Sequence, residues 1–167
     1  ATALDRGEQQ ELFLDNLKKL AELGFMGLNV DAEYGGTEAG VIAFSVALTE
    51  IARACASTAV TVSVNNMVNE VIQALGSEEQ KQKYIPRICS GEYLAGAFAL
   101  TEAGAGSDPA GMTTTAVRDG DHWVLNGSKM WITNSHYADA LIITAKTDLE
   151  AKGSRGITAF IVPTDTP

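Results

Sequence analysis

A glycine-rich turn after a short apolar run is the strongest candidate for chemistry in this sequence. The run 93–101 has strand length and leads into a turn that contains Gly104, Gly106 and Ser107. Where no Cβ blocks access, successive backbone amides form a concavity that binds a phosphate or pyrophosphate. The turn is not the dinucleotide-fold fingerprint, because Pro109 occupies the position of the third glycine. Taken alone, such a turn is more often a plain connection.

A second segment, KMWITN at residues 129–134, could complete a ligand site with this turn. Taken alone, Trp131 on a short strand is more often a core aromatic, and Thr133 is more often a surface or ladder residue. Beside an anion-binding turn, the same residues would help to cradle a flat, phosphate-bearing ring system. This interpretation requires the turn 101–107 and the segment 131–133 to lie side by side.

The two segments together closely resemble the acyl-CoA dehydrogenase family, whose middle β domain carries a TEPGxGSD loop and a KxWITN strand. The likeness covers nearly the whole chain, since ELGFMGLNVDAEYGG and GSEEQKQKYIPRICSGE also resemble the family. VNNMV, GSEEQKQKY and WVLNGSK look most like its short-chain branch. Ala103 departs from the family pattern, where proline is common, and loosens the loop without removing a ligand group.

The resemblance implies that the chain binds FAD. Backbone groups near Phe98 and Leu100 and the Thr101 hydroxyl would face the isoalloxazine ring, and Ser107 would lie between the flavin and the acyl-CoA substrate. Trp131 would pack beside the flavin, and Thr133 would donate a hydrogen bond near its reactive nitrogen, which favours the charge that develops as hydride arrives. The implied cofactor-binding residues are Phe98, Ala99, Leu100, Thr101, Gly104, Gly106, Ser107, Trp131, Ile132 and Thr133.

The titratable residues near these motifs are given no catalytic role. Glu102 and Asp108 flank the turn, where we expect them to accept hydrogen bonds from local amides. His122 and His136 have no partner at metal-ligand spacing and read as surface residues. The sequence therefore predicts no metal site and no catalytic residue within the chain.

Desaturation of a thioester needs a base to take the α proton while hydride leaves the β carbon. In the family this base is a glutamate of a C-terminal helical domain. The resemblance implies that this domain would follow Pro167 and that the family's first helix is missing ahead of Ala1. The chain alone is expected to be inactive. The alternatives are a non-catalytic flavin- or acyl-CoA-binding domain, and a flavin oxidase or monooxygenase on the same scaffold. The resemblance also implies an electron-transfer flavoprotein as acceptor, a homotetramer, and a bacterial cytoplasmic or mitochondrial matrix location.

The first part of the chain is predicted to be helical. An amphipathic helix is expected over 11–23, with Phe13, Leu17 and Leu20 on one stripe. Two largely buried helices are expected over 41–54 and 58–75, the second with Ser57 as N-cap. Ser77 and Gln80 have capping-box spacing for a further helix towards Cys89, interrupted or bent near Pro86.

The second part is predicted to be antiparallel β structure. Runs rich in branched and aromatic residues have strand length, and Asp119-Gly120 and Asn126-Gly127 between them suit hairpin turns. The predicted fold is α+β, with an all-α domain over 1–92 followed by an incomplete antiparallel β-barrel or sandwich over 93–167, a truncated middle domain. The runs are TTTAVRD, HWVL, KMWIT, ALIITAK and GITAFIV.

Composition excludes several classes of protein. The net charge of -9, from 21 acidic and 12 basic residues, opposes binding to nucleic acid. The two cysteines, Cys55 and Cys89, lack the spacing of a disulfide framework or zinc site. The sequence has no apolar run of membrane-spanning length, and its first residues do not resemble a secretory signal, so we expect neither a membrane span nor secretion.

Overall fold

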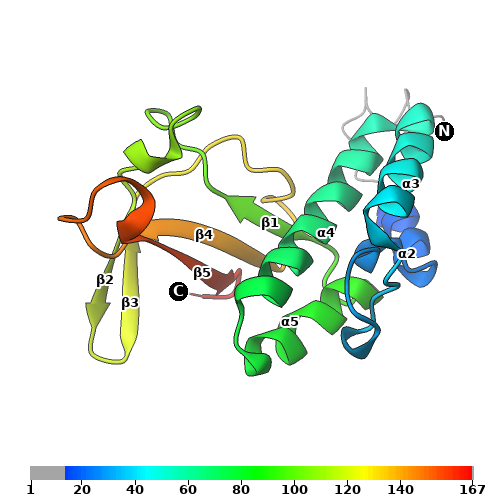
Figure 1. Ribbon diagram of the computed structural model, residues 1–167, viewed down its shortest axis with the longest axis horizontal. Helices are drawn as coiled ribbons and strands as arrows, with labels where there is room; N and C mark the ends of the chain where they lie inside the picture. The colour runs from blue at the N-terminus through cyan, green and yellow to red at the C-terminus, as the bar shows by residue number, and fades with distance from the viewer. Residues whose placement is uncertain (1–13, 167) are drawn as a thin grey trace.

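The computed structural model describes residues 14–166, in which a group of helices packs beside one β-sheet (Figure 1). This arrangement confirms the predicted α+β fold with a helical first part and a β second part. Residues 11–13, which include Phe13 of the first predicted helix, lie outside the described residues. The helices are α2 (Leu14–Glu22), α3 (Gly40–Ala54), α4 (Ala56–Leu75) and α5 (Glu78–Ser90), and two short 3-10 turns, η1 (Phe25–Gly27) and η2 (Ala32–Tyr34), join α2 to α3.

The predicted N-terminal cap is correct for helix α5 and incorrect for helix α4. The predicted capping box at the start of α5 is confirmed, because the Ser77 side chain accepts from the Gln80 amide and the Gln80 side chain accepts from the Ser77 amide. The helix continues through Pro86 to Ser90, so the predicted interruption is wrong, and the alternative of a bend near Pro86 stays a prediction. Ser57 is not an N-cap, since α4 already begins at Ala56. Within residues 14–166, no helix is both long enough and apolar enough to cross a membrane.

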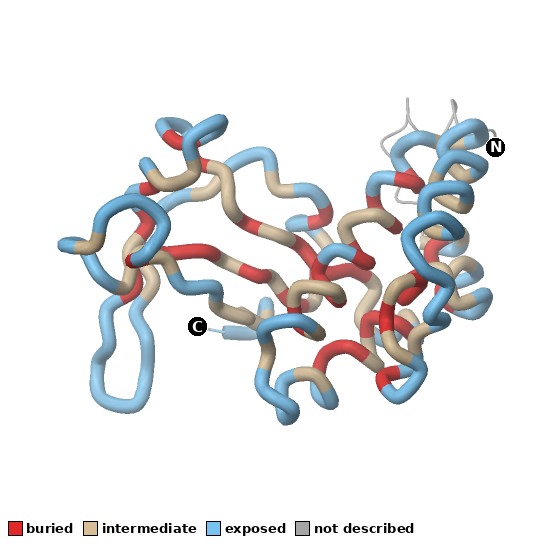
Figure 2. The backbone as a smooth tube through the Cα atoms, in the orientation of Figure 1, coloured by how far each residue is buried: buried red, intermediate tan, exposed pale blue. Residues whose placement is uncertain are grey.

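Helix α3 is far more exposed than its apolar sequence predicts. None of its residues is buried, and Val41 and Ile42 are 73% and 82% exposed. Helix α4 has nine buried residues and lies between α3 and the sheet (Figure 1). The prediction of two largely buried helices is therefore right for α4 and wrong for α3, because α3 packs mainly against α4 and leaves all of its residues at least partly exposed (Figure 2).

The sheet is mixed, which corrects the prediction of a purely antiparallel arrangement. Strands β2 and β3 form the expected hairpin across Asp119-Gly120, and β4 and β5 are also antiparallel. Strand β1, however, runs parallel to β4, because the long connection between them lets the chain re-enter the sheet in the same direction. The strands are β1 (Gly96–Ala99), β2 (Thr115–Asp119), β3 (His122–Asn126), β4 (Ala140–Lys146) and β5 (Ile157–Pro163).

The predicted strand KMWIT does not form. After Asn126 the chain leaves the sheet, and residues 128–134 lie in no strand. Trp131 and Asn134 have φ angles of 58° and 70°, which a strand cannot contain. Gly127 passes so close to Thr114 that an added Cβ would lie 2.7 Å from its Cα. The Asn126-Gly127 pair therefore serves a close backbone approach and not a second hairpin.

A single apolar cluster joins the helices to the sheet. Val68 and Ile72 of α4 and Ile85 of α5 are at most 2% exposed and belong to the same cluster as Ala140 and Ile142 of β4. Buried residues are concentrated at this junction (Figure 2). Because β4 pairs with β1, this core also fixes where β1 ends and the glycine-rich turn begins.

We predict that Ile85→Ala lowers the free energy of unfolding by about 3 kcal/mol, because it removes a fully buried side chain and leaves a cavity. Ile42→Ala, the same change at a position 82% exposed, should cost about 0.5 kcal/mol or less. Urea denaturation followed by circular dichroism measures both values. Equal losses for the two variants would contradict this assignment of the core.

Candidate functional site

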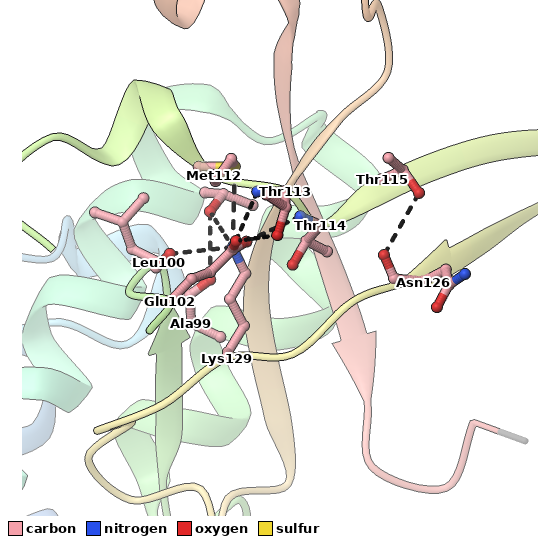
Figure 3. A network of polar contacts seen from close by, with 10 residues as sticks. Ala99, Leu100, Glu102, Met112, Thr113, Thr114, Thr115, Asn126 and Lys129 are labelled. Carbon is pink, nitrogen blue, oxygen red and sulfur yellow. Dashed lines mark hydrogen bonds and ion pairs between the residues drawn. The ribbon is translucent and has the colours of Figure 1, made fainter. Parts of the chain in front are cut away.

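Two segments that are distant in the sequence meet just beyond the end of β1. The Met130 amide donates to the Thr101 carbonyl at 2.9 Å, and Lys129 Nζ donates to the Leu100 carbonyl at 3.0 Å. Figure 3 shows Lys129 extending from its own segment towards Leu100 and Glu102. The start of the turn 101–107 and the start of the segment 129–134 therefore lie side by side. That residues 131–133 also lie beside the turn, as the sequence interpretation requires, stays a prediction.

A buried ion pair joins these two segments. Lys129 Nζ lies 2.8 Å from Glu102 Oε1, and the two side chains are only 9% and 5% exposed. Thr113 donates to Glu102 Oε2 through its amide at 2.6 Å and its hydroxyl at 2.9 Å, and the Thr114 amide donates to Oε1 at 3.0 Å. Both carboxylate oxygens therefore have donors, which compensates for the loss of hydration.

The surroundings of Glu102 keep it ionised. Burial by itself raises the pKa of this carboxyl, because a charged group loses its water. Hydrogen bonds from Lys129, Thr113 and Thr114 outweigh burial and hold the pKa of Glu102 well below its usual range. Glu102 therefore accepts local amides, as predicted, and so does Asp108, whose side chain accepts from the Ala110 amide at 3.2 Å.

The glycine-rich turn presents unused backbone donors. Glu102 and Ala105 exchange two backbone hydrogen bonds of 3.1 and 3.2 Å, which close the start of the turn. Across residues 14–166, the amides of Gly104, Gly106 and Ser107 donate to no protein acceptor. A Cβ built at either glycine would meet nothing within 4 Å, so the space outside the turn is open. The turn can therefore receive an anion through its backbone.

The segment after Lys129 holds an aromatic side chain in solvent. Trp131 is 85% exposed and has a φ of 58°, a region that bulky side chains rarely occupy. Such strain persists only where the surrounding structure enforces it, and it is concentrated at functional sites. Trp131 and its neighbours line an open surface hollow formed by Trp131, Ile132, Thr133, Ser135 and His136.

Asn134 anchors the other end of this segment. Its side-chain amide donates to the Gly96 carbonyl at 3.0 Å, and its carbonyl accepts from the Tyr137 hydroxyl at 2.9 Å. The Tyr137 hydroxyl also lies 3.2 Å from Thr61 Oγ1 of α4. The segment is thus tied to both β1 and the helical layer.

The sequence-predicted site residues divide by exposure. Phe98 packs against the main core and Ala99 is 2% exposed, so both offer a ligand mainly backbone groups. The Ala99 carbonyl already accepts from the Thr144 hydroxyl at 3.3 Å. The remaining residues are either half-buried (Leu100, Thr101 and Ile132) or exposed (Gly104, Gly106, Ser107, Trp131 and Thr133).

Sequence reasoning missed the enclosed residues that hold the segment 130–133 in place. Lys129 was part of a motif but had no assigned role, and Asn134 was likewise passed over. One signal was available, because a lysine followed directly by Met130 and Trp131 needs a counter-charge if it is buried, and Glu102 lay in the partner motif. Across residues 14–166, no group of three or more His, Cys, Asp or Glu residues could hold a metal ion.

Comparison with known families agrees with this geometry. Residues 1–92 match the profile described as acyl-CoA dehydrogenase, N-terminal domain, and residues 97–167 match acyl-CoA dehydrogenase, middle domain. The chain belongs to the acyl-CoA dehydrogenase family. The mouse short-chain specific acyl-CoA dehydrogenase, a mitochondrial protein, is 46% identical over 169 residues, which is 100% of this chain and 40% of that protein.

Solved structures of similar proteins share the fold. Glutaryl-CoA dehydrogenase from Mycobacterium smegmatis in complex with FADH2 has a TM-score of 0.83 at 40% identity and covers 93% of this chain. The prolyl acyl carrier protein oxidase AnaB has a TM-score of 0.87 at 34% identity and covers 96%. The matched regions are 39% and 43% of those chains, so this chain spans about 40% of the length of the proteins it matches.

We predict that Glu102→Gln lowers the free energy of unfolding at neutral pH by about 3 kcal/mol, because it leaves Lys129 buried without a counter-charge. The lowered pKa of Glu102 makes its contribution fully present above the unfolded-state pKa of about 4.3 and lost as the pH falls towards the folded-state value. The variant should therefore lose less stability than the wild type on acidification.

Urea denaturation at several pH values from neutral to acidic measures this difference. Glu50→Gln is the matched control, since Glu50 pairs with Arg53 at the surface with side chains 63% and 72% exposed. It should change stability by about 0.5 kcal/mol or less. The assignment is wrong if the Glu102 and Glu50 variants behave alike.

Proposed function

We propose that a protein of the relatives' length containing this chain is a flavin-dependent oxidoreductase that desaturates an acyl-CoA thioester between its α and β carbons. Two observations support the proposal in a chain of this family. Exposed Trp131 lies on a segment whose Met130 amide donates to the Thr101 carbonyl at the start of the turn, and the amides of Gly104, Gly106 and Ser107 in that turn are unused. An exposed indole at a strained backbone position is costly to maintain without a ligand.

The residues of the site fit FAD. The unused amides of Gly104, Gly106 and Ser107 suit its pyrophosphate, since they are backbone donors with open space in front of them. The Trp131 indole offers a flat apolar surface for a ring system. Thr133 is exposed and its hydroxyl has no partner among the described residues, so it is free to donate to a ring atom. FADH2 in the Mycobacterium smegmatis relative also supports this choice.

Bound FAD would accept the hydride that leaves the substrate β carbon. The chain's own contribution is to hold and orient, with the turn binding the anionic part and Trp131 limiting the ring plane. The Thr133 hydroxyl would stabilise negative charge that develops nearby. Removal of the α proton needs a base, which we assign to a glutamate in a C-terminal helical domain of the longer protein and not to Glu102, whose carboxylate is occupied by Lys129 and two amides.

We propose a short acyl-CoA as substrate, supported by the 46% identity to the short-chain specific mouse enzyme. Ser107, exposed at the end of the turn, would lie between the flavin and the acyl-CoA. An electron-transfer flavoprotein as acceptor, a homotetramer, and a mitochondrial matrix or bacterial cytoplasmic location extend the same proposal from the family resemblance.

A flavin oxidase is the second candidate, favoured by the fold shared with the oxidase AnaB. The two activities differ in where the electrons go. A dehydrogenase passes them to a protein acceptor and reacts slowly with oxygen, whereas an oxidase consumes oxygen when substrate is added.

We predict that the longer protein, purified with FAD, is yellow and loses its flavin absorbance when butyryl-CoA is added without oxygen. The absorbance is lost because hydride transfer reduces the flavin. Oxygen consumption on substrate addition in air would favour the oxidase, and a colourless protein that ignores both FAD and butyryl-CoA would leave a non-catalytic binding domain. Octadecanoyl-CoA is the control for chain length and should bleach the flavin more slowly.

We predict that Trp131→Ala weakens FAD binding about tenfold, because it removes the stacking surface. Folding should be little affected, since the side chain is 85% exposed. Trp123→Ala is the control, because Trp123 lies in the sheet outside the site. Its ring centroid is 5.4 Å from that of Phe160. Titration of the apoprotein with FAD measures both affinities. A larger loss for the Trp123 variant would contradict the proposed stacking.

A further inference from the structure

The exposed segment 130–133 is held at its two ends more than by contacts of its own. Met130, Trp131 and Thr133 are exposed, whereas the flanking Lys129 and Asn134 side chains are almost completely enclosed. Among the described residues, residues 130–133 take part in two backbone hydrogen bonds. The Met130 amide donates to the Thr101 carbonyl, and the Ile132 carbonyl accepts from the Ser135 amide. Its shape therefore depends on the flanking anchors.

The first anchor is the Lys129 ammonium. It donates to the Glu102 carboxylate at 2.8 Å and to the Leu100 carbonyl at 3.0 Å, and it lies 3.5 Å from Thr144 Oγ1 of β4. These partners come from the end of β1, from the glycine-rich turn and from β4. One cation thus fixes the start of the exposed segment relative to the turn and the sheet (Figure 3).

The second anchor is the Asn134 side chain, which is 5% exposed and has a left-handed backbone. Besides Gly96 and Tyr137, it approaches Asn65 Oδ1 of α4 at 3.5 Å. Asn65 is fully buried and also accepts from the Gly96 amide at 2.9 Å. The end of the segment is therefore fixed to the start of β1 and to the helical layer.

We propose that Lys129, through Glu102, and Asn134 are positioning residues that hold Trp131 and Thr133 in a binding-ready arrangement before any ligand arrives. Neither side chain reaches the solvent face where a ligand would lie, so both act through the segment between them. The identity of the ligand, FAD, rests on the function proposed above, but the preorganisation of the segment does not. A rigid, preformed segment binds its ligand more tightly because less conformational entropy is lost on binding.

A merely structural role would give a different result. In that case loss of either anchor would weaken ligand binding only as far as it destabilises the whole protein. The double variant Glu102→Gln with Lys129→Met separates the two roles, because it leaves no buried charge unpaired and so restores much of the stability. It does not restore the bond to the Leu100 carbonyl, which only the lysine makes.

The experiment measures three quantities on the longer protein that contains this chain: the thermal midpoint, amide hydrogen exchange over residues 129–135, and FAD affinity. The variants are Lys129→Met, Lys129→Arg, the double variant, and Asn134→Gly, which keeps access to the left-handed backbone while removing the side-chain bonds. Ile85→Val is the control, since it weakens the core at a buried position outside the site.

We expect exchange over 129–135 to be about tenfold faster in Lys129→Met, Asn134→Gly and the double variant, even where the thermal midpoint recovers. FAD binding should weaken about tenfold in the same three variants and recover in part with Lys129→Arg. Ile85→Val should change neither quantity. Affinity that tracks the thermal midpoint across all variants, or exchange that stays at the wild-type rate, would overturn the proposal.

The exchange measurement also separates this inference from the proposed function. A wild-type protein that takes up no FAD would refute the flavin assignment. The exchange rates of the ligand-free variants would still decide whether Lys129 and Asn134 hold the segment in place.

Discussion

The contact on which the site depends is the buried ion pair between Glu102 and Lys129. Two charges that lose their hydration are stabilised only when each finds several partners, and here the carboxylate receives three further donors besides the ammonium. The charge requirement itself draws the glycine-rich turn, the start of β2 and the segment after β3 together. Apolar packing could not fix these irregular stretches with the same precision, because their backbones lie outside the sheet and leave few apolar side chains to bury.

Much of the fold could be predicted because local chemistry and hydrophobic pattern agreed. The capping box at Ser77, the Asp119-Gly120 hairpin and the strand from Ala140 to Lys146 all followed from residue type and spacing. The errors arose where tertiary structure overrode the pattern. KMWIT has the composition of a strand, but the buried lysine and the left-handed Asn134 take it out of the sheet. Helix α3 has an apolar sequence, yet among the described residues it packs mainly against α4 and none of its own residues is buried.

The site could be predicted only in part, for a related reason. The residues that we propose to bind a ligand carry recognisable types at short spacing, so the turn and the Trp131 segment stood out. Residues that hold those segments act through contacts between distant parts of the chain, and single-sequence spacing does not encode such contacts. Lys129 and Glu102 are far apart in sequence, and the link from Asn134 to Asn65 spans a still longer separation.

The anchors also explain how the chain keeps free amides and the Trp131 indole exposed while their backbone keeps a fixed shape. Unused amides and an exposed indole favour ligand binding only if they do not collapse onto each other in the free protein. The anchors prevent this, since they lie on the protein side of the segment and are enclosed by β1, β4 and α4. Because the apolar cluster of α4, α5 and β4 fixes the positions of those elements, the helical layer contributes to the site without touching its ligand face. A change deep in α4 at Asn65 would therefore reach the Trp131 segment through Asn134.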